Sequence, residues 1–244
     1  MIQDEEKESF YDDILYFNDK SYLDLVIDTN LESDDFVDKN ILDFGSGSGE
    51  VSAILAKKGA RSVLALDIGK KNISHGRTTY ATLNNLTFER QDLNLYVLAE
   101  DSFDLIWSDT VVELLRRPFD EMADEFFRSL RHGGILYVSL TEKTLFTSLL
   151  YTTLRIINKK ISRSLIRVLK FIAALKIQIF RDDFDKKNFE EKTKYFFIPY
   201  IQLISRERAT QALERAGFRI EYIRNRIKSD LNSTVHFEIR AKKC

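Results

Sequence analysis

The segment "ILDFGSGSGE", residues 41–50, decides the fold. A hydrophobic run ends at Phe44, and Gly45, Gly47 and Gly49 then alternate with serines. Glycines between a strand and a helix let the backbone approach a ligand closely, and the first turn of the helix adds unpaired N–H groups. The segment therefore predicts a ligand-binding turn between a buried strand and a helix.

The spacing of the glycines argues against a dinucleotide. The fingerprint G-x-G-x-x-G places its third glycine where this chain has Glu50. Asp43, at the end of the strand, would face a pyrophosphate unfavourably. A cofactor that has a positive centre and no phosphate fits the turn better.

The rest of the chain alternates short apolar runs with longer amphipathic stretches. This rhythm predicts a parallel sheet with helices on both faces. Near the C-terminus, Val235, Phe237 and Ile239 alternate with polar residues, which is typical of an antiparallel strand with one solvated face. We expect strands at 40–45, 62–68, 86–92, 103–109, 135–140, 218–226 and 233–243, and helices at 9–30, 49–60, 70–84, 118–131 and 205–216.

Residues 141–204 interrupt this rhythm. They contain no glycine, and between 161 and 179 apolar residues recur at helical spacing. Both ends of the segment fall between consecutive core elements. We therefore interpret 141–204 as a helical cap inserted into a single domain, 1–244, with residues 1–39 as an N-terminal helical lid.

Composition points to an intracellular globular protein. The formal net charge is −1, hydrophobic residues make up 44%, and Cys244 is the one cysteine. A disulfide framework is therefore impossible, which fits a reducing compartment. The acidic start "MIQDEEKESF" has no apolar core of a signal peptide, and the uncharged stretch 144–154 is too short to span a membrane. We expect a cytoplasmic location.

The stretch "ILDFGSGSGEVSAILAKKGA" resembles the glycine motif D-x-G-x-G-x-G of the class I S-adenosylmethionine-dependent methyltransferases. The resemblance covers 40–140 and 204–241, and is nearest to small-molecule enzymes of the ubiquinone-biosynthesis type. It implies a Rossmann-like, doubly wound α/β fold with seven strands, mostly parallel, and an antiparallel C-terminal strand. Further family landmarks follow in order, namely "LALDI", "FERQDL", "FDLIWSDTVVELLRRP", "FFRSLRHGGILYVS" and "ISRERATQALERAGF".

The resemblance implies S-adenosylmethionine as cofactor and assigns its methionine end. Gly45, Ser46 and Gly47 would pass beside the methionine part. Asp43 would interact with the loop or with the cationic amino group. Ser108 would offer its carbonyl to that amino group.

The same resemblance assigns the nucleoside end. Asp67, followed by Ile68, would accept hydrogen bonds from both ribose hydroxyls. Asp92 would accept from the adenine amine, with Leu93 beside the ring. Tyr16, or alternatively Tyr11, would close over the cofactor from the N-terminal helix. The resemblance implies no metal site.

A catalytic base is harder to assign. Relatives of the ubiquinone type often carry Glu-His in "V-L-E-H" after the fourth strand, whereas this chain has "VVELL". Glu113 matches, and Leu114 replaces the histidine. Either Glu113 takes the acceptor's proton, or the acceptor needs no base.

Two classes of nucleic-acid methyltransferase can be excluded, which narrows the range of possible methyl acceptors. Cys244 at the extreme terminus is implausible as the nucleophile of cytosine methylation, and "SDTV" lacks the N/D/S-P-P-Y/F signature of enzymes that methylate amino groups in nucleic acids. We therefore expect methyl transfer to the O or N of a small, apolar or amphipathic or lipid-like acceptor, and no nucleic-acid partner. The alternatives are other S-adenosylmethionine chemistry such as aminopropyl transfer, a protein methyltransferase, or a non-catalytic scaffold.

Charge is distributed unevenly along the chain. Residues 1–40 hold thirteen acidic and three basic residues, a formal charge of −10, and residues 142–181 hold nine basic residues and one acidic, a charge of +8. A basic, apolar helix is typical of contact with an anionic membrane. Pairing of the cap with the acidic N-terminal segment is the alternative reading.

Overall fold

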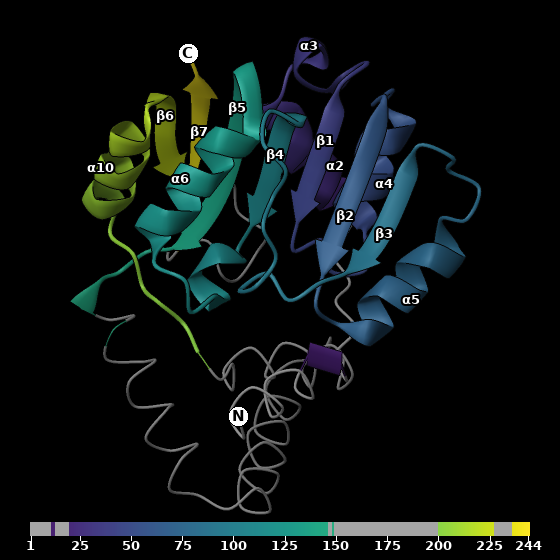
Figure 1. The fold of residues 1–244 in the computed structure, drawn as a ribbon, viewed down its shortest axis with the longest axis horizontal. Coiled ribbons are helices and arrows are strands. Elements are labelled where there is room, and N and C mark those ends of the chain that lie inside the picture. The colour runs from purple at the N-terminus through teal and green to yellow at the C-terminus, as the bar shows by residue number, and fades with distance from the viewer. Residues whose placement is uncertain (1–10, 13–19, 146–147, 149–199, 227–235) are drawn as a thin grey trace, which may run out of the picture. The chain divides into compact units, whose positions relative to one another are not determined.

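The fold is seen in a computed structural model that describes residues 11–12, 20–145, 148, 200–226 and 236–244. By its internal contacts the chain divides into two compact units. The first joins Met1–Glu142 to Gln202–Cys244, and the second is Lys143–Ile201. Nearly all of the predicted cap lies outside the described residues, so its helical structure and membrane contact stay predictions. The strands and helices labelled in Figure 1 belong to the first unit.

Seven strands form one sheet in the described part of the chain, in the order β3-β2-β1-β4-β5-β7-β6 (Figure 1). Strands β1 to β5 pair in parallel, whereas β7 runs antiparallel to both β5 and β6. The predicted fold class is therefore confirmed. The strands are β1 (Asn40–Phe44), β2 (Ser62–Asp67), β3 (Leu86–Arg90), β4 (Phe103–Asp109), β5 (Leu130–Thr141), β6 (Phe218–Asn225) and β7 (His236–Lys243).

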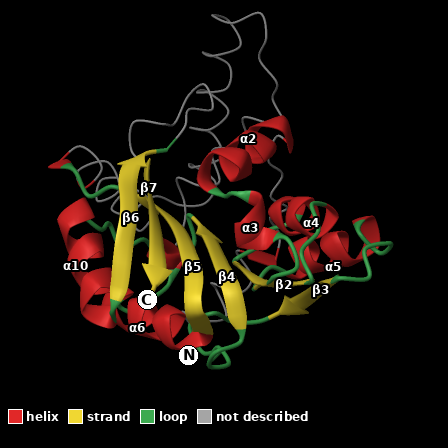
Figure 2. Ribbon diagram, turned by 90° about the horizontal axis from the view of Figure 1, so that it is seen from above, coloured by secondary structure: helices red, strands yellow, loops and turns green. Residues whose placement is uncertain are grey.

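Helices cover both faces of the sheet (Figures 1 and 2). α6 and α10 pack on one face, and α2, α4 and α5 on the other. As the sequence predicts, Ser205 caps α10 by accepting from the Arg208 N–H, and Gly217 ends that helix in a left-handed conformation. The helices are α2 (Lys20–Asn30), α3 (Ser33–Phe36), α4 (Glu50–Lys57), α5 (Lys70–Thr79), α6 (Phe119–Ser129) and α10 (Arg206–Ala216), with a 3-10 turn at Val112–Leu114.

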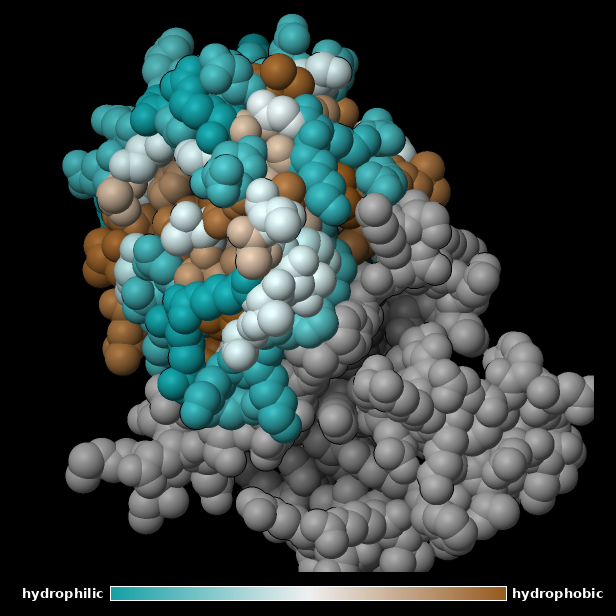
Figure 3. Space-filling view, turned by 90° about the vertical axis from the view of Figure 1, so that its right-hand side faces the viewer, coloured by the Kyte–Doolittle hydropathy of each residue, from teal (hydrophilic) through white to brown (hydrophobic). Residues whose placement is uncertain are grey.

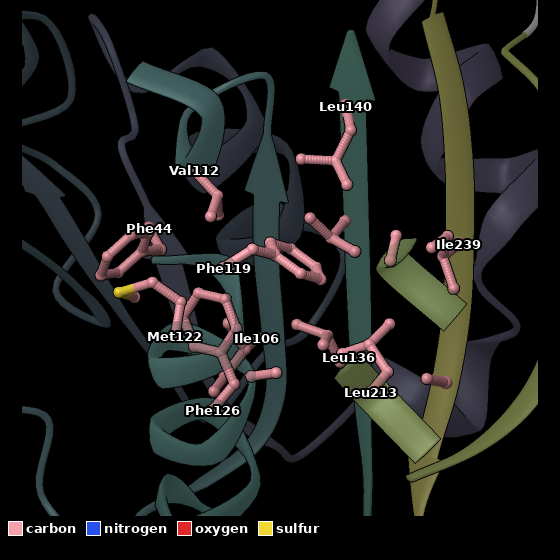
Figure 4. Packing of buried hydrophobic residues seen from close by; sticks show 14 of the residues in the cluster. Phe44, Ile106, Val112, Phe119, Met122, Phe126, Leu136, Leu140, Leu213 and Ile239 are labelled. Carbon is pink, nitrogen blue, oxygen red and sulfur yellow. The ribbon is translucent and has the colours of Figure 1, made fainter. Parts of the chain in front are cut away.

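Alternate residues of the central strands enter two separate cores, which explains why these strands read as continuous apolar runs. Ile106 and Leu136 face α6 and α10 and pack against Phe126 (Figure 4). Trp107 and Tyr137 face the other side, where their rings stack with centroids 3.8 Å apart. Both faces of the middle of the sheet are thus removed from water.

Two expectations about strands are wrong. The fifth strand begins at Leu130 and not at 135, because its pairing with β4 continues through an irregularity at which Gly133 adopts φ +78°. The polar face of β7 is not solvated, since Glu238 is completely buried. The cause is α2, whose Asn30 side chain donates to Glu238 at 3.4 Å.

The surface at the β3 edge of the sheet is mainly hydrophilic, with smaller apolar areas between the polar ones (Figure 3). On this edge strand, Thr87 and Arg90 are exposed while Phe88 is buried. Polar side chains on an edge strand discourage pairing with another chain. Among the described residues, no helix is long and apolar enough to cross a membrane.

Candidate cofactor and acceptor site

The glycine turn lies at the carboxyl edge of the parallel strands, between β1 and α4. Gly45, Gly47 and Gly49 all have positive φ, at +83°, +55° and +90°. A Cβ on Gly45 would lie 2.3 to 2.8 Å from the side-chain carbons of Val111, which follows β4. The first glycine is therefore required by close packing inside the protein as well as by its backbone conformation.

Asp43 faces α4 from the end of β1. It is almost completely buried and accepts a hydrogen bond from the Ser52 hydroxyl. Burial raises the pKa of Asp43 to about 7, against the opposing effect of the Ser52 hydrogen bond. The contact seen for Asp43 is with Ser52 of α4, the helix that follows the turn, and its two predicted roles stay predictions.

Asp67, at the end of β2, holds the two neighbouring turns together. Its Oδ2 accepts from the Gly47 N–H at 3.0 Å, and its Oδ1 accepts from the Gly69 N–H at 2.7 Å and from the Asn72 side chain at 3.3 Å. Burial raises its pKa to about 6 in spite of these donors. A carboxylate has about four acceptor sites and three are used here, so Oδ2 retains capacity for one hydroxyl of a ribose.

The predicted adenine residues follow β3. Asp92 Oδ1 accepts from the backbone and side-chain nitrogens of Asn94, at 2.9 and 2.8 Å. Leu93 is buried in the core under α6, so its backbone is the part left for a ligand. Ile68, next to Asp67, accepts from Arg90 through its carbonyl at 2.9 Å. The structure brings Asp67 and Asp92 to the same edge, since the Gln91 N–H donates to the Asp67 carbonyl.

Described residues of the N-terminal segment reach the turn after β2, where the ribose is predicted to bind. Tyr11 is buried, and its carbonyl lies 3.1 Å from the position of a Cβ on Gly69. Asp12 accepts from the Lys70 N–H at 2.8 Å and from Arg90 at 3.2 Å. Tyr16, the preferred lid residue, lies outside the described residues and stays a prediction.

Ser108 lies in β4, and Glu113 lies in the 3-10 turn that follows this strand. Ser108 is fully buried in β4, and within the described part of the chain its hydroxyl has no hydrogen-bond partner. Glu113 is buried in the 3-10 turn, where Oε1 accepts from the N–H and hydroxyl of Thr141 at 3.2 and 3.1 Å. Burial raises the pKa of Glu113 to about 7.

The structure adds a polar cluster that sequence reasoning missed. Arg226, just after β6, donates to both carboxylate oxygens of Asp109 at 2.6 Å, and the Ser139 hydroxyl donates to Asp109 at 2.5 Å. His236 Nδ1 lies 3.5 Å from the Thr141 hydroxyl, and burial together with Arg226 lowers its pKa to about 4. No pattern in the sequence marks this cluster, because its members come from four strand ends far apart in the chain.

Thr110 joins the cluster to the glycine turn. It adopts φ +56°, a strained conformation for a β-branched residue, and its N–H donates to the Ser139 carbonyl at 3.1 Å. The next residue, Val111, packs on Gly45. A strained backbone position thus lies between the predicted cofactor turn and Glu113.

Comparison with known proteins identifies the fold of this site. Residues 41–134 match the methyltransferase domain family. A ribosomal protein L11 methyltransferase of Dictyoglomus thermophilum is 31% identical over 100 residues, which are 41% of this chain and 32% of that protein. The chain thus spans about a third of the length of the curated relatives it matches.

Solved structures agree on the architecture. An S-adenosylmethionine-dependent methyltransferase of Mesorhizobium loti shares 18% identity with a TM-score of 0.60, over 91% of this chain and 96% of that one. A protein of Listeria monocytogenes described in similar terms shares 16% identity with a TM-score of 0.62, over 93% and 100%. These similarities show that the chain shares the fold of such enzymes. The glycine turn and the carboxylate of Asp67 fit the S-adenosylmethionine that the sequence resemblance implies.

Proposed function

We propose that this chain, whose residues 41–134 match the methyltransferase domain family, transfers the methyl group of S-adenosylmethionine to an oxygen or nitrogen of a small molecule. The observation that carries the proposal is Asp67, which ties the Gly47 turn to the Gly69 turn. That arrangement holds a carboxylate beside a glycine turn, where a ribose and a methionine chain would lie side by side.

The reaction needs alignment more than it needs chemical groups from the protein. A lone pair on the acceptor attacks the methyl carbon, the carbon–sulfur bond breaks, and sulfur keeps the electron pair as S-adenosylhomocysteine forms. Holding the reactants in line and excluding water supplies most of the acceleration. The wall beside the glycine turn is the Thr110–Val111 segment, which leads directly to Glu113.

Glu113 is the proposed base for an acceptor that loses a proton. Its buried Oε2 has no hydrogen-bond partner among the described residues, while Oε1 is fixed by Thr141. A pKa of about 7 suits a group that takes a proton near neutral pH. The proton leaves the acceptor for Oε2 as the new bond to the methyl carbon forms.

A protein acceptor is the second candidate. It rests on the curated relatives, which are named for methylation of ribosomal protein L11. Since this chain spans only about a third of such a relative, the similarity concerns the methyltransferase domain and leaves the acceptor open.

One experiment separates the candidates. The full chain is incubated with methyl-labelled S-adenosylmethionine and a cell extract that has been separated by size into metabolites and proteins. Label in the metabolite fraction, lost in Asp67→Ala, supports a small acceptor, and label in the protein fraction supports the alternative. Calorimetry with S-adenosylhomocysteine tests the cofactor independently, and absence of binding would refute the whole proposal.

A further inference from the structure

A row of polar groups follows one side of the sheet at its carboxyl edge. Alternate residues of β5 point to the same side of the strand. Tyr137 on that side belongs to the apolar core, and Ser139 and Thr141 continue the row beyond it. On β4, Trp107 is likewise followed by Asp109. The side chains therefore become polar where the α2-facing core ends, next to the glycine turn.

Two side chains that bind this row each have a buried polar atom without a hydrogen bond. Glu113 Oε2 and Arg226 Nε are both buried, and neither has a hydrogen-bond partner within the described part of the chain. Buried polar atoms in proteins are nearly always hydrogen-bonded, so each such atom calls for an explanation. The two atoms have opposite character, because a carboxylate oxygen accepts and a guanidinium N–H donates. A single ligand that carries both a donor and an acceptor satisfies them together.

The residues that anchor the two side chains lie close together on β5. Glu113 is fixed at Thr141, and Arg226 is fixed by Asp109, which accepts from Ser139. Ser139 and Thr141 are two residues apart on one side of β5, a separation of about 7 Å along the strand. Both side chains are therefore anchored at the same edge of the sheet.

Arg226 is oriented for a single directed contact. Both terminal nitrogens of its guanidinium bind Asp109, and one of them also donates to the Ser139 hydroxyl at 3.4 Å, whereas Nε has no partner among the described residues. The ring of Tyr22 lies 5.7 Å from the guanidinium carbon. Because Asp109 balances the positive charge, this donor recognises an oxygen by direction more than by net charge.

Resting on the proposed function, we propose that Arg226 is an acceptor-binding residue whose Nε–H donates to one oxygen of the methyl acceptor, while Glu113 Oε2 accepts from the hydroxyl or amine that is methylated. The acceptor class is thus a small molecule with a proton-bearing oxygen or nitrogen and a second oxygen several ångströms away. That second oxygen belongs to a carbonyl or to a carboxylate. A purely apolar acceptor offers no oxygen to the buried Nε–H of Arg226, which would then stay without a hydrogen bond.

The test reads Arg226 directly, without turnover. The full chain is labelled with ¹⁵N-arginine and saturated with S-adenosylhomocysteine, and the Nε–H signal of Arg226 is followed by NMR. The signal is assigned by its loss in Arg226→Lys or, if that variant does not fold, by its cross-peak with the Tyr22 ring. The probes are glycolate, 3-hydroxypropanoate and 4-hydroxybutanoate, their amides, and propanoate and propanol as single-group controls.

We expect at least one hydroxylated probe to move the Arg226 signal at concentrations about tenfold below those of propanoate and propanol. Glu113→Gln should remove that preference while leaving S-adenosylhomocysteine binding unchanged. The comparison of acids with amides tells whether the oxygen is charged. An unmoved Arg226 signal, or equal shifts with hydroxylated and single-group probes, overturns the inference. Failure of S-adenosylhomocysteine to bind at all instead overturns the proposed function.

Discussion

The hydroxyl of Tyr137 donates to Glu238 at 2.9 Å, and the two side chains are completely buried although they are far apart in the sequence. Arg224 donates to the other oxygen of Glu238 at 2.6 Å, and Asn30 of α2 completes the group. The network therefore fastens α2 to the β6–β7 hairpin. It stands where the sequence pattern predicts a solvated face.

Replacing Glu238 by glutamine should destabilise the fold. The substitution removes the carboxylate that faces Tyr137 and Arg224, and breaking a buried, charged hydrogen-bond group costs about 1–3 kcal/mol. Urea unfolding measures the change. Asp38→Asn is the matched control, because the Asp38–Arg61 ion pair is exposed, and it should leave the midpoint unchanged. Equal effects of the two substitutions would contradict a buried network.

Gly45→Ala should cost much more stability than Gly133→Ala. Both glycines have positive φ, at +83° and +78°, so both substitutions carry a backbone penalty of about 1 kcal/mol. A Cβ at Gly45 would also overlap Val111, whereas nothing lies within 4 Å of a Cβ at Gly133. Thermal unfolding of the two variants gives the difference.

The cause of that difference is tested by Val111→Ala. Adding it to Gly45→Ala should recover part of the loss, because the smaller side chain frees the space. Additive losses in the double variant would show that the overlap with Val111 is not the reason.

Asp67→Ala should weaken binding of S-adenosylhomocysteine roughly thirty- to 150-fold, since a charge-assisted hydrogen bond to the ribose contributes on the order of 2–3 kcal/mol. The carboxyl accepts this bond most strongly when it is ionised, and its pKa is about 6. Wild-type affinity should therefore fall as pH drops below about 6. Calorimetry of Asp67→Asn between pH 5 and 8 supplies the control, which should show a weaker dependence on pH.

Asp43 should make the fold less stable as pH rises. Its folded pKa of about 7 lies above the ordinary 3.8, so the folded state holds a proton that the unfolded state has lost. The free energy of unfolding is accordingly highest below pH 4 as far as this group is concerned, and it falls between pH 4 and 7 by up to about 4 kcal/mol. Denaturant titrations of Asp43→Asn should show a shallower fall over this range. A parallel pH dependence in both proteins would remove Asp43 as its source.

Much of the fold is readable from the sequence because it depends on local signals. The runs ending at Phe44, Asp67 and Asp109 are apolar on both faces, which marks them as central parallel strands. Ser205 and Gly217 bound a helix by their own side-chain and backbone chemistry. Boundaries fail where pairing overrides local signals, as in β5, which continues through Gly133 towards Leu130.

For the same reason, the positions of the proposed cofactor residues follow from the sequence more directly than the positions of the proposed acceptor residues. Asp43, Asp67 and the glycines lie next to the strand ends that they follow, so sequence position gives their place in space. Arg226 meets Asp109 only because β5 and β7 bring β6 to the same edge as β4. Likewise, apolar and polar residues alternate around Glu238 in the same way whether or not a helix covers the polar face of β7, so the sequence does not reveal that Glu238 is buried.

Val111 occupies the space that a side chain on Gly45 would need, and it stands two residues before Glu113. The turn that would receive the cofactor and the turn that carries the proposed base are therefore packed against each other, so a displacement of one would be passed to the other. A cofactor that fixes the position of the first turn would therefore also fix the position of the second. In kinetic terms, this favours an ordered reaction in which the cofactor enters before the acceptor and its spent form leaves last.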